Sequence, residues 1–269
     1  MSQQYGNALP INYQYELSSA IYRILSCADR DYATWLHENG FQMENETKKF
    51  KLFSFSNLIV PNYGIDREHQ RLLLNSHFVD WYLSFLPNNS TQKFIEGVFK
   101  EQVFEVGDKW SKVQFAVRDI QILPPMEYQE EMTFRTMSPV CITQHEPDGT
   151  ITYLSPTAPN YEIALLTGLM SRYEALHGER YTGDRYCKLR LLSDPRSKLV
   201  KIKGKTHNQT LVRGYLYTFT LSLPEPLMHI AYEGGIGEKT SLGFGMIEAH
   251  TAKSTKYQLN DNKKYGICL

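Results

Sequence analysis

A histidine at the end of a predicted helix is well placed to donate a proton. His37 lies in the last turn of a short helix that is expected to begin near Asp31 and to stop at Asn39-Gly40, because glycine takes the positive φ of a C-cap. The carbonyl end of a helix carries partial negative charge, which favours an imidazolium there. That group could protonate a leaving alkoxide. A single histidine on a helix is more often an ordinary surface or core residue.

The second feature is a glycine-rich run over residues 233–246, in which two glycine pairs flank a polar insert. Glycine lacks a Cβ and takes positive φ readily, so a phosphate or another backbone can approach such a loop closely. The four residues are Gly235, Gly237, Gly243 and Gly245. The insert contains Lys239, a further phosphate contact, beside Glu238. The spacing excludes a dinucleotide fingerprint and a P-loop. A structural loop that packs the C-terminal sheet against its neighbour is the alternative.

Basic residues form a third feature, with Asp194 as the one acidic residue among them. The cluster contains Arg185, Lys188, Arg190, Arg196, Lys198, Lys201, Lys203, Lys205 and Arg213. Tyrosines are interleaved, and this combination is typical of a phosphate track in a nucleic-acid-binding protein. Strand alternation from Lys201 to Lys205 would place three lysines on one face. A run of charge is more often only a solvated surface.

The elements that position these residues are predicted from hydrophobic periodicity. In the first half we expect helices over 18–28, from 31 and over 91–101, and strands over 50–55, 72–74, 79–85, 103–106 and 112–122. Pro124-Pro125, followed by three glutamates, is the best candidate for the boundary between two modules. We therefore expect one module over residues 1–126 and another over 127–269.

The second half repeats this order. We expect strands over 132–136, 140–143, 151–154, 188–192, 199–203, 211–221 and 244–248, and a helix from Pro159 to Gly178. The apolar stripe of that helix contains Ile163, Leu166, Met170, Tyr173 and His177. Periodicity alone predicts an α+β class, and two halves of similar order fit a pair of ferredoxin-like modules.

Composition narrows the class of protein. The formal net charge is zero, so any nucleic-acid site must come from local clustering. Four widely spaced cysteines without a Cys-x-x-Cys pair are typical of a reducing compartment and give no zinc signature. No signal peptide or membrane span is apparent. The histidines show no ligand spacing. We therefore expect a cytoplasmic protein without a metal or cofactor.

The motif Gly-x-Gly-Glu-Lys-x-Ser-x-Gly-Phe-Gly, which starts at Gly235, resembles the C-terminal motif of the CRISPR-associated endoribonucleases that cut repeat RNA into guide units, the Cas-six family. The region from Leu9 through Phe55 is similar to the N-terminal region of the same family. The resemblance implies two tandem ferredoxin-like (RRM-like) modules. It also implies a phosphodiester as the bond that is cut.

By matching motifs, the family tyrosine corresponds to Tyr22, the histidine to His37 and the lysine to Lys51. The resemblance implies that Tyr22 orients the phosphate or the 2′-hydroxyl, that His37 handles the proton and that Lys51 neutralises charge on the phosphorane. Taken singly, Tyr22 would be core packing and Lys51 an exposed strand residue. The basic cluster and the glycine-rich loop would then contact the repeat RNA.

One departure concerns the first strand. In the family a strand precedes the segment Pro10-Ile-Asn-Tyr-Gln-Tyr15, and the first strand of a ferredoxin-like sheet is central. Only nine residues precede Pro10 here, including Gly6. We expect this strand to be missing or short, which would leave unpaired backbone groups on its neighbours.

The resemblance implies a metal-independent endoribonuclease that makes guide RNA and leaves 5′-hydroxyl and 2′,3′-cyclic phosphate ends. The alternative is a non-catalytic RNA-binding subunit of a CRISPR ribonucleoprotein complex. A nucleotide-binding protein is disfavoured by the absent fingerprint. The expected partner is repeat RNA, with effector-complex subunits and a homodimer left open, and no membrane.

Overall fold

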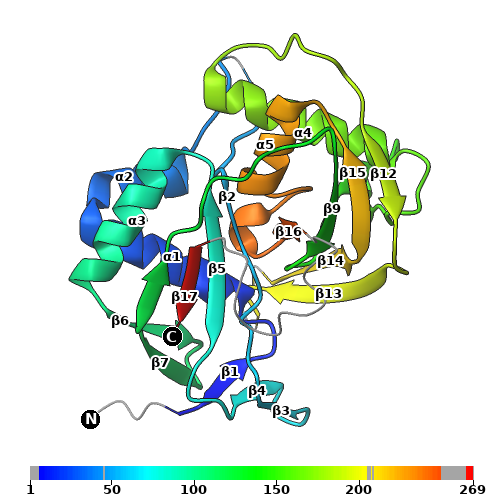
Figure 1. Cartoon of the computed structure of the whole chain (residues 1–269). Helices are drawn as coiled ribbons and strands as arrows, with labels where there is room; N and C mark the ends of the chain where they lie inside the picture. The colour runs from blue at the N-terminus through cyan, green and yellow to red at the C-terminus, as the bar shows by residue number, and fades with distance from the viewer. Residues whose placement is uncertain (1–5, 45, 205–206, 208, 250–264, 269) are drawn as a thin grey trace.

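The computed structural model describes residues 6–44, 46–204, 207 and 209–249, and the backbone of residues 265–268. These residues form two α+β halves, in which helices α1, α2 and α3 lie beside one sheet and α4 and α5 beside another (Figure 1). The α+β class and the paired modules predicted from the sequence are confirmed. Within the described residues, no helix is long and apolar enough to cross a membrane.

The helices of the first half are α1 (Gln14–Ala28), α2 (Arg30–Glu38) and α3 (Asn88–Lys100). In α1, Leu17, Ile21 and Leu25 are fully buried at helical spacing, which explains why this segment is helical. The Asp29 side chain accepts a hydrogen bond from the backbone of Tyr32 and so caps the start of α2. The predicted C-terminal end of α2 at Asn39-Gly40 is also present, since Gly40 has a φ of 70°.

The main sheet of the first half has the order β2-β5-β17-β8. Its strands are β2 (Phe53–Phe55), β5 (Asp80–Phe85), β8 (Asp119–Gln121) and β17 (Tyr265–Cys268). Strand β17 runs antiparallel to β5 on one side and to β8 on the other. The centre of the first sheet is therefore filled from the C-terminal part of the sequence, beside β5 in Figure 1.

The first strand of the chain is short, as expected, and lies in another sheet. Strand β1 (Ala8–Pro10) pairs with β4 (Arg71–Leu74), which pairs in turn with β3 (Tyr63–Asp66). A hairpin of β6 (Val103–Gly107) and β7 (Lys112–Ala116) lies nearby. The unpaired backbone groups that we expected beside a missing central strand are paired here, because β17 lies between β5 and β8.

The second half contains the sheet β12-β15-β9-β16. Its strands are β9 (Glu131–Thr136), β12 (Lys188–Leu191), β15 (Thr218–Ser222) and β16 (Ile247–Ala249). Helices α4 (Tyr161–His177) and α5 (Glu225–Gly234) pack with them around a second core. No element was predicted over residues 225–234, which form α5.

The predicted stripe of α4 is only partly wrong, since Leu166, Met170 and Tyr173 pack against the second core whereas its two end residues are exposed. Ile163 is 69% exposed, and the buried face carries Leu165, Leu169 and Arg172. Apolar residues lie on most sides of this helix, so periodicity does not mark the buried side clearly.

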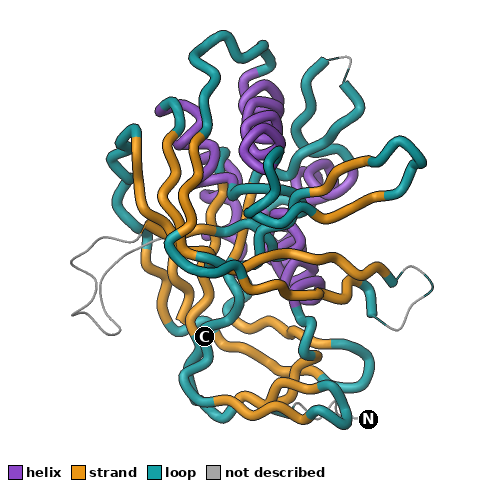
Figure 2. Tube along the Cα trace, turned by 90° about the vertical axis from the view of Figure 1, so that its right-hand side faces the viewer, coloured by secondary structure: helices purple, strands orange, loops and turns teal. Residues whose placement is uncertain are grey.

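Two hairpins extend from the second half, toward the right of Figure 2. They are β10 (Thr143–His145) with β11 (Ile151–Tyr153), and β13 (Arg196–Ile202) with β14 (Thr210–Leu216). The inner face of β13–β14 buries Val200, Ile202 and Val212 against Phe244 of the glycine-rich run. The basic hairpin is thereby fixed to the body of the molecule.

Candidate functional site

Three side chains from separate elements meet at the C-terminal end of α2. The rings of Tyr22 and His37 contact edge to face, with centroids 4.9 Å apart and planes at 87°. Lys51 Nζ donates a hydrogen bond of 2.7 Å to the carbonyl oxygen of His37. His37 is exposed, whereas Tyr22 and Lys51 are half-buried. A phenol, an imidazole and an ammonium therefore share one partly open site.

The backbone at Leu52 makes this convergence possible. Leu52 has a φ of 53°, an uncommon conformation for a residue with a branched side chain, and it is 1% exposed. Its side chain enters the core of the second half, while the preceding residue, Lys51, turns toward α2. The predicted strand over 50–55 is therefore shorter, since β2 begins at Phe53 and Phe50 only forms a bridge with Phe41.

The pKa values at the site respond to burial. Burial raises the pKa of the Tyr22 phenol, and the nearby Tyr32 adds to this effect. Burial also lowers the pKa of the Lys51 ammonium, with a further contribution from the charge of Lys49. The phenol therefore stays protonated well into the alkaline range, where it can donate a hydrogen bond. The Lys51 charge is lost at a lower pH than that of an exposed lysine.

The glycine-rich run lies between the two halves. Gly237 and Gly245 have φ values of 74° and 73°, and a Cβ on either would come within 2.4 Å of Cys141 O or 1.9 Å of Ile236 O. A Cβ on Gly235 or Gly243 would similarly meet side chains of the first half. We predicted that a phosphate or another backbone approaches this loop closely, and the atoms that do so here belong to the protein itself. Contact of these four buried glycines with RNA remains untested.

The same run holds α1 in place. Ser18 Oγ of α1 donates a hydrogen bond of 2.6 Å to the carbonyl oxygen of Ser241, and the Thr240–Leu242 turn contacts both α1 and β2. The two charged residues of the polar insert differ in their surroundings. Glu238 accepts hydrogen bonds from the backbone and the hydroxyl of Thr143, whereas Lys239 is exposed. The glycine-rich run thus supports the helix that carries Tyr22.

Arg172 of α4 fixes this run from the other side. Its guanidinium is 4% exposed and donates to the carbonyl oxygens of Gly235, at 2.9 Å, and Gly237. Its cationic carbon lies 5.9 Å from the centre of the Phe50 ring, next to Lys51 in sequence. Sequence reasoning missed Arg172, although an arginine inside an apolar helix was the available signal.

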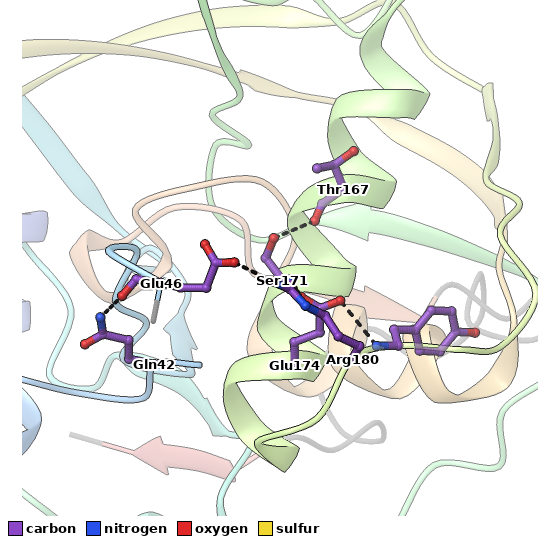
Figure 3. A network of polar contacts seen from close by, with 7 residues as sticks. Gln42, Glu46, Thr167, Ser171, Glu174 and Arg180 are labelled. Atoms are coloured by element: carbon purple, nitrogen blue, oxygen red, sulfur yellow. Dashed lines mark hydrogen bonds and ion pairs between the residues drawn. The ribbon is translucent and has the colours of Figure 1, made fainter. Parts of the chain in front are cut away.

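A surface network ties the segment after α2 to α4. Figure 3 shows Arg180 between Glu46 and Glu174, with ion-pair distances of 2.7 Å and 3.0 Å. Gln42 Nε2 donates to the carbonyl oxygen of Glu46 in the same network. The segment between His37 and Lys51 is therefore anchored to the second half at its surface.

The predicted RNA-contacting lysines and arginines lie on several elements. Lys188 and Arg190 are exposed on β12, whereas Lys198, Lys201 and Arg213 lie on the β13–β14 hairpin. The prediction that the lysines from Lys201 to Lys205 lie on one face of a strand is wrong, since β13 ends at Ile202 and Lys203 follows with a φ of 51°. Lys205 lies outside the described residues.

The hairpin reaches the start of the helix that carries Tyr22. Lys203 Nζ lies 5.9 Å from the centre of the Tyr15 ring. Tyr15 and Tyr22 are separated by about 10 Å along α1, at ~1.5 Å per residue. One basic side chain, Lys203, therefore lies beside a tyrosine that is about two helical turns from Tyr22 on the same helix. Within the described residues, no three His, Cys, Asp or Glu side chains gather into a metal site.

Two family models match the chain in tandem. Residues 8–121 match "CRISPR-associated protein Cas6, N-terminal", and residues 123–249 match "CRISPR associated protein Cas6, C-terminal". A Methanocaldococcus jannaschii protein named "CRISPR-associated endoribonuclease Cas6 1" is 30% identical over 243 residues, which are 89% of this chain and 86% of that protein. The chain belongs to the Cas6 family. The "CRISPR-associated endoribonuclease Cas6" of Pyrococcus furiosus is 24% identical and covers 92% of the chain, at 86% of its own length.

Two solved structures have the same fold. A structure of "CRISPR associated protein Cas6" superposes with a TM-score of 0.69 at 26% identity, over 92% of this chain and 95% of that one. Another, described as "An RAMP protein binding different RNA substrates", gives a TM-score of 0.75 at 25% identity over 93% and 96%. The family resemblance read from the two ends of the sequence is confirmed.

Proposed function

We propose that this Cas6 chain is an endoribonuclease that cuts CRISPR repeat RNA into guide RNA without a metal ion. The observation that carries the proposal is the meeting of Tyr22, His37 and Lys51 at the end of α2. Relatives named endoribonucleases support the reaction class. Repeat RNA as substrate rests on the same relatives.

The proposed reaction is an internal transesterification. The 2′-oxygen of the RNA attacks the neighbouring phosphorus and loses its proton to solvent water, and the bond to the 5′-oxygen breaks. His37 gives a proton to that leaving oxygen, so the products are a 5′-hydroxyl and a 2′,3′-cyclic phosphate. His37 is the exposed member of the three, which allows it to reach the strand.

Tyr22 and Lys51 act on the phosphate. A protonated phenol hydrogen-bonds the phosphate or orients the 2′-hydroxyl, and burial keeps Tyr22 protonated by raising its pKa. Lys51 uses one donor on the helix carbonyl, which leaves two for the charge that develops on phosphorus. Because the helix carbonyl fixes the ammonium, little reorganisation is needed during the reaction.

The basic residues of β12, of the β13–β14 hairpin and of the glycine-rich insert are proposed as the RNA-contacting surface. Arg213 and Lys198 lie on β14 and β13, and Lys188, Arg190, Lys203 and Lys239 are exposed. Contacts to phosphate make affinity depend strongly on salt.

Cleavage of the repeat RNA of the chain's own locus tests the proposal, with excess chelator present. We expect site-specific cutting by the wild type and a loss of at least ~100-fold in His37→Ala, the scale of a general acid. His177→Ala is the matched control, because His177 also lies in the last turn of a helix but stacks on Tyr173 in the second half. A substrate with a 2′-deoxy nucleotide at the cleavage position should not be cut.

Three outcomes would contradict the proposal. A strict requirement for a divalent metal would reject the mechanism. Equal activity of His37→Ala and His177→Ala would reject the site. Tight RNA binding without cleavage under all conditions would favour the non-catalytic RNA-binding subunit.

A further inference from the structure

Strand β17 occupies a slot between two strands that are otherwise not connected in the described residues. Ile267 is paired with Trp81 of β5 on one side and with Ile120 of β8 on the other. Within the described sheet, β8 has β17 as its single neighbour. The link between β8 and the rest of the sheet therefore passes through four residues of β17.

The sheet of the second half has a strand in the position that corresponds to that of β17. Its sheet order, β12-β15-β9-β16, places β9 between β15 and β16, and β9 comes before the first helix of that half. The order β2-β5-β17-β8 places β17 in the equivalent position, with the same antiparallel direction to both neighbours. β17 is thus a central strand by position, although it follows every other element of its half in sequence.

An empty slot would be costly for the first half. The backbone groups of β5 and β8 that face β17 would lose their partners in the middle of a sheet. The side chains of Trp81 and Leu83 on β5 are buried in the core that also contains Ile21 and Leu25 of α1. Loosening of β5 would therefore spread to the helix that carries Tyr22.

We propose that residues 265–268 form a detachable strand, which docks in cis into the slot between β5 and β8 and can be replaced there by the same sequence supplied as a separate peptide. Residues 250–264 join it to β16 in the other sheet, so docking closes a loop and does not continue a hairpin. Main-chain pairing on both sides is the mode by which sheets accept an added strand.

A disulfide tests the register and the cis connection in the full-length chain. Cys268 is paired with Asp119 of β8, and directly paired residues in antiparallel strands lie within the span of a disulfide. Under mild oxidation we expect Asp119→Cys to form an intrachain bond with Cys268, identified by mass spectrometry, while Asp119→Cys with Cys268→Ser forms none there. A covalent dimer through these residues would overturn docking in cis. No bond at any oxidant strength would overturn the register.

Truncation after Lys264 tests whether the strand is detachable. We expect amide hydrogen exchange of β5 and β8 to accelerate by at least ~100-fold, while β9 and β15 keep their protection. A peptide of residues 262–269 at millimolar concentration should restore protection in β5 and β8, and the same peptide with proline at position 267 should not. Unchanged exchange after truncation, or no effect of the peptide, would overturn the proposal.

A point substitution covers the case in which the truncated chain does not fold. Ile267→Pro removes a backbone donor from a strand paired on both sides, whereas Ile267→Val keeps it. We expect accelerated exchange in β5 and β8 for the proline variant alone, and equal exchange in the two variants would contradict a docked strand. These readouts follow folding, so they stay informative whether or not the chain cuts RNA.

Discussion

Lys51 reaches the end of α2 because its neighbour, Leu52, accepts a left-handed backbone conformation. Such a conformation is unfavourable for leucine and persists only where the surroundings compensate. Here the Leu52 side chain is buried in the core of the second half. The position of one ammonium group in the first half therefore depends on packing in the other half.

Substitution of Lys51 tests its charge through pH. Burial lowers the pKa of Lys51 below the ~10.4 of a free lysine. The cleavage rate of the wild type should therefore fall with rising pH before the pH reaches that value. The charged form is the one required, so activity is lost as pH rises through the pKa in the folded protein. Lys51→Arg should be slower but lack this alkaline decline, because guanidinium stays charged. The measurement is the single-turnover rate against pH.

If the cleavage rate of Lys51→Arg falls at alkaline pH as it does in the wild type, the decline is caused by the titration of another group. Tyr22 is excluded as that group, since burial raises its pKa.

The Tyr22 hydroxyl is tested separately from its ring. Tyr22→Phe keeps the edge-to-face contact with His37 and the 5.8 Å contact with Phe53. Removal of one hydrogen bond to a charged phosphate, worth about 1.5–3 kcal/mol, should slow cleavage about 10- to 100-fold without a change in stability. Tyr22→Ala should also lower the unfolding midpoint. A wild-type rate for Tyr22→Phe would leave the residue with a packing role only.

Some of this residue-level picture was predictable from the sequence. The helix stop at Gly40 placed His37 in a last turn, and motif matching selected Tyr22 and Lys51. The dihedral angle of Leu52 could not be predicted, because nothing in a local apolar sequence marks a buried leucine for positive φ. Arg172 was missed because the apolar stripe predicted for α4 does not include it, although Leu166, Met170 and Tyr173 of that stripe do pack against the core.

At the scale of elements, the glycine-rich run acts as a spacer between α1, β2 and the second half. Its backbone lies close to Cys141, and its Ile236 and Gly245 are joined by a backbone hydrogen bond of 2.8 Å. Side chains at the glycine positions would push these elements apart.

Alanine substitution of Gly245 tests this role. A Cβ there would lie 1.9 Å from Ile236 O at a φ of 73°, so we expect destabilisation by more than ~2 kcal/mol in urea unfolding. Gly168→Ala is the control, because Gly168 lies inside α4 with open space around it and should gain about 0.5–1 kcal/mol. Full stability of Gly245→Ala combined with weaker RNA binding would instead favour direct contact with RNA.

Helix α5 was missed at this scale although its sequence carries a helical pattern. Glu225, His229 and Glu233 recur every four residues on its less buried side, while Leu227, Met228, Ile230 and Ala231 are buried. The amphipathic α1 was predicted correctly because one of its faces is exposed.

At the scale of the whole molecule, the two halves are joined through buried contacts as well as surface charges. Arg172 binds the glycine-rich run inside the protein, whereas Arg180 pairs with Glu46 at the surface and is 62% exposed. Both arginines lie on or just after α4, so they form a matched pair.

We expect Arg172→Met to lower the free energy of unfolding by about 2–5 kcal/mol, because two buried carbonyl groups lose their donor. Arg180→Ala should cost no more than about 1 kcal/mol, as is usual for exposed ion pairs. Urea unfolding measures both values. Equal effects would show that Arg172 does not hold the halves together.

The position of β17 could not be predicted from local patterns. Its partners, β5 and β8, lie far away in the sequence, and a short apolar segment alone does not specify with which strand it pairs. The family resemblance indicated that a central strand would be missing or short, but the sheet order was needed to recognise that β17 takes its place.

The late position of β17 in the chain also sets the order of events during synthesis. Domains generally fold from the N-terminus as they leave the ribosome. Here α1, β5 and β8 emerge long before the strand that lies between β5 and β8. The half that carries Tyr22 and His37 therefore waits for translation to pass residue 268, while the later-made half can already be complete, so a stalled ribosome would hold the proposed nuclease unassembled.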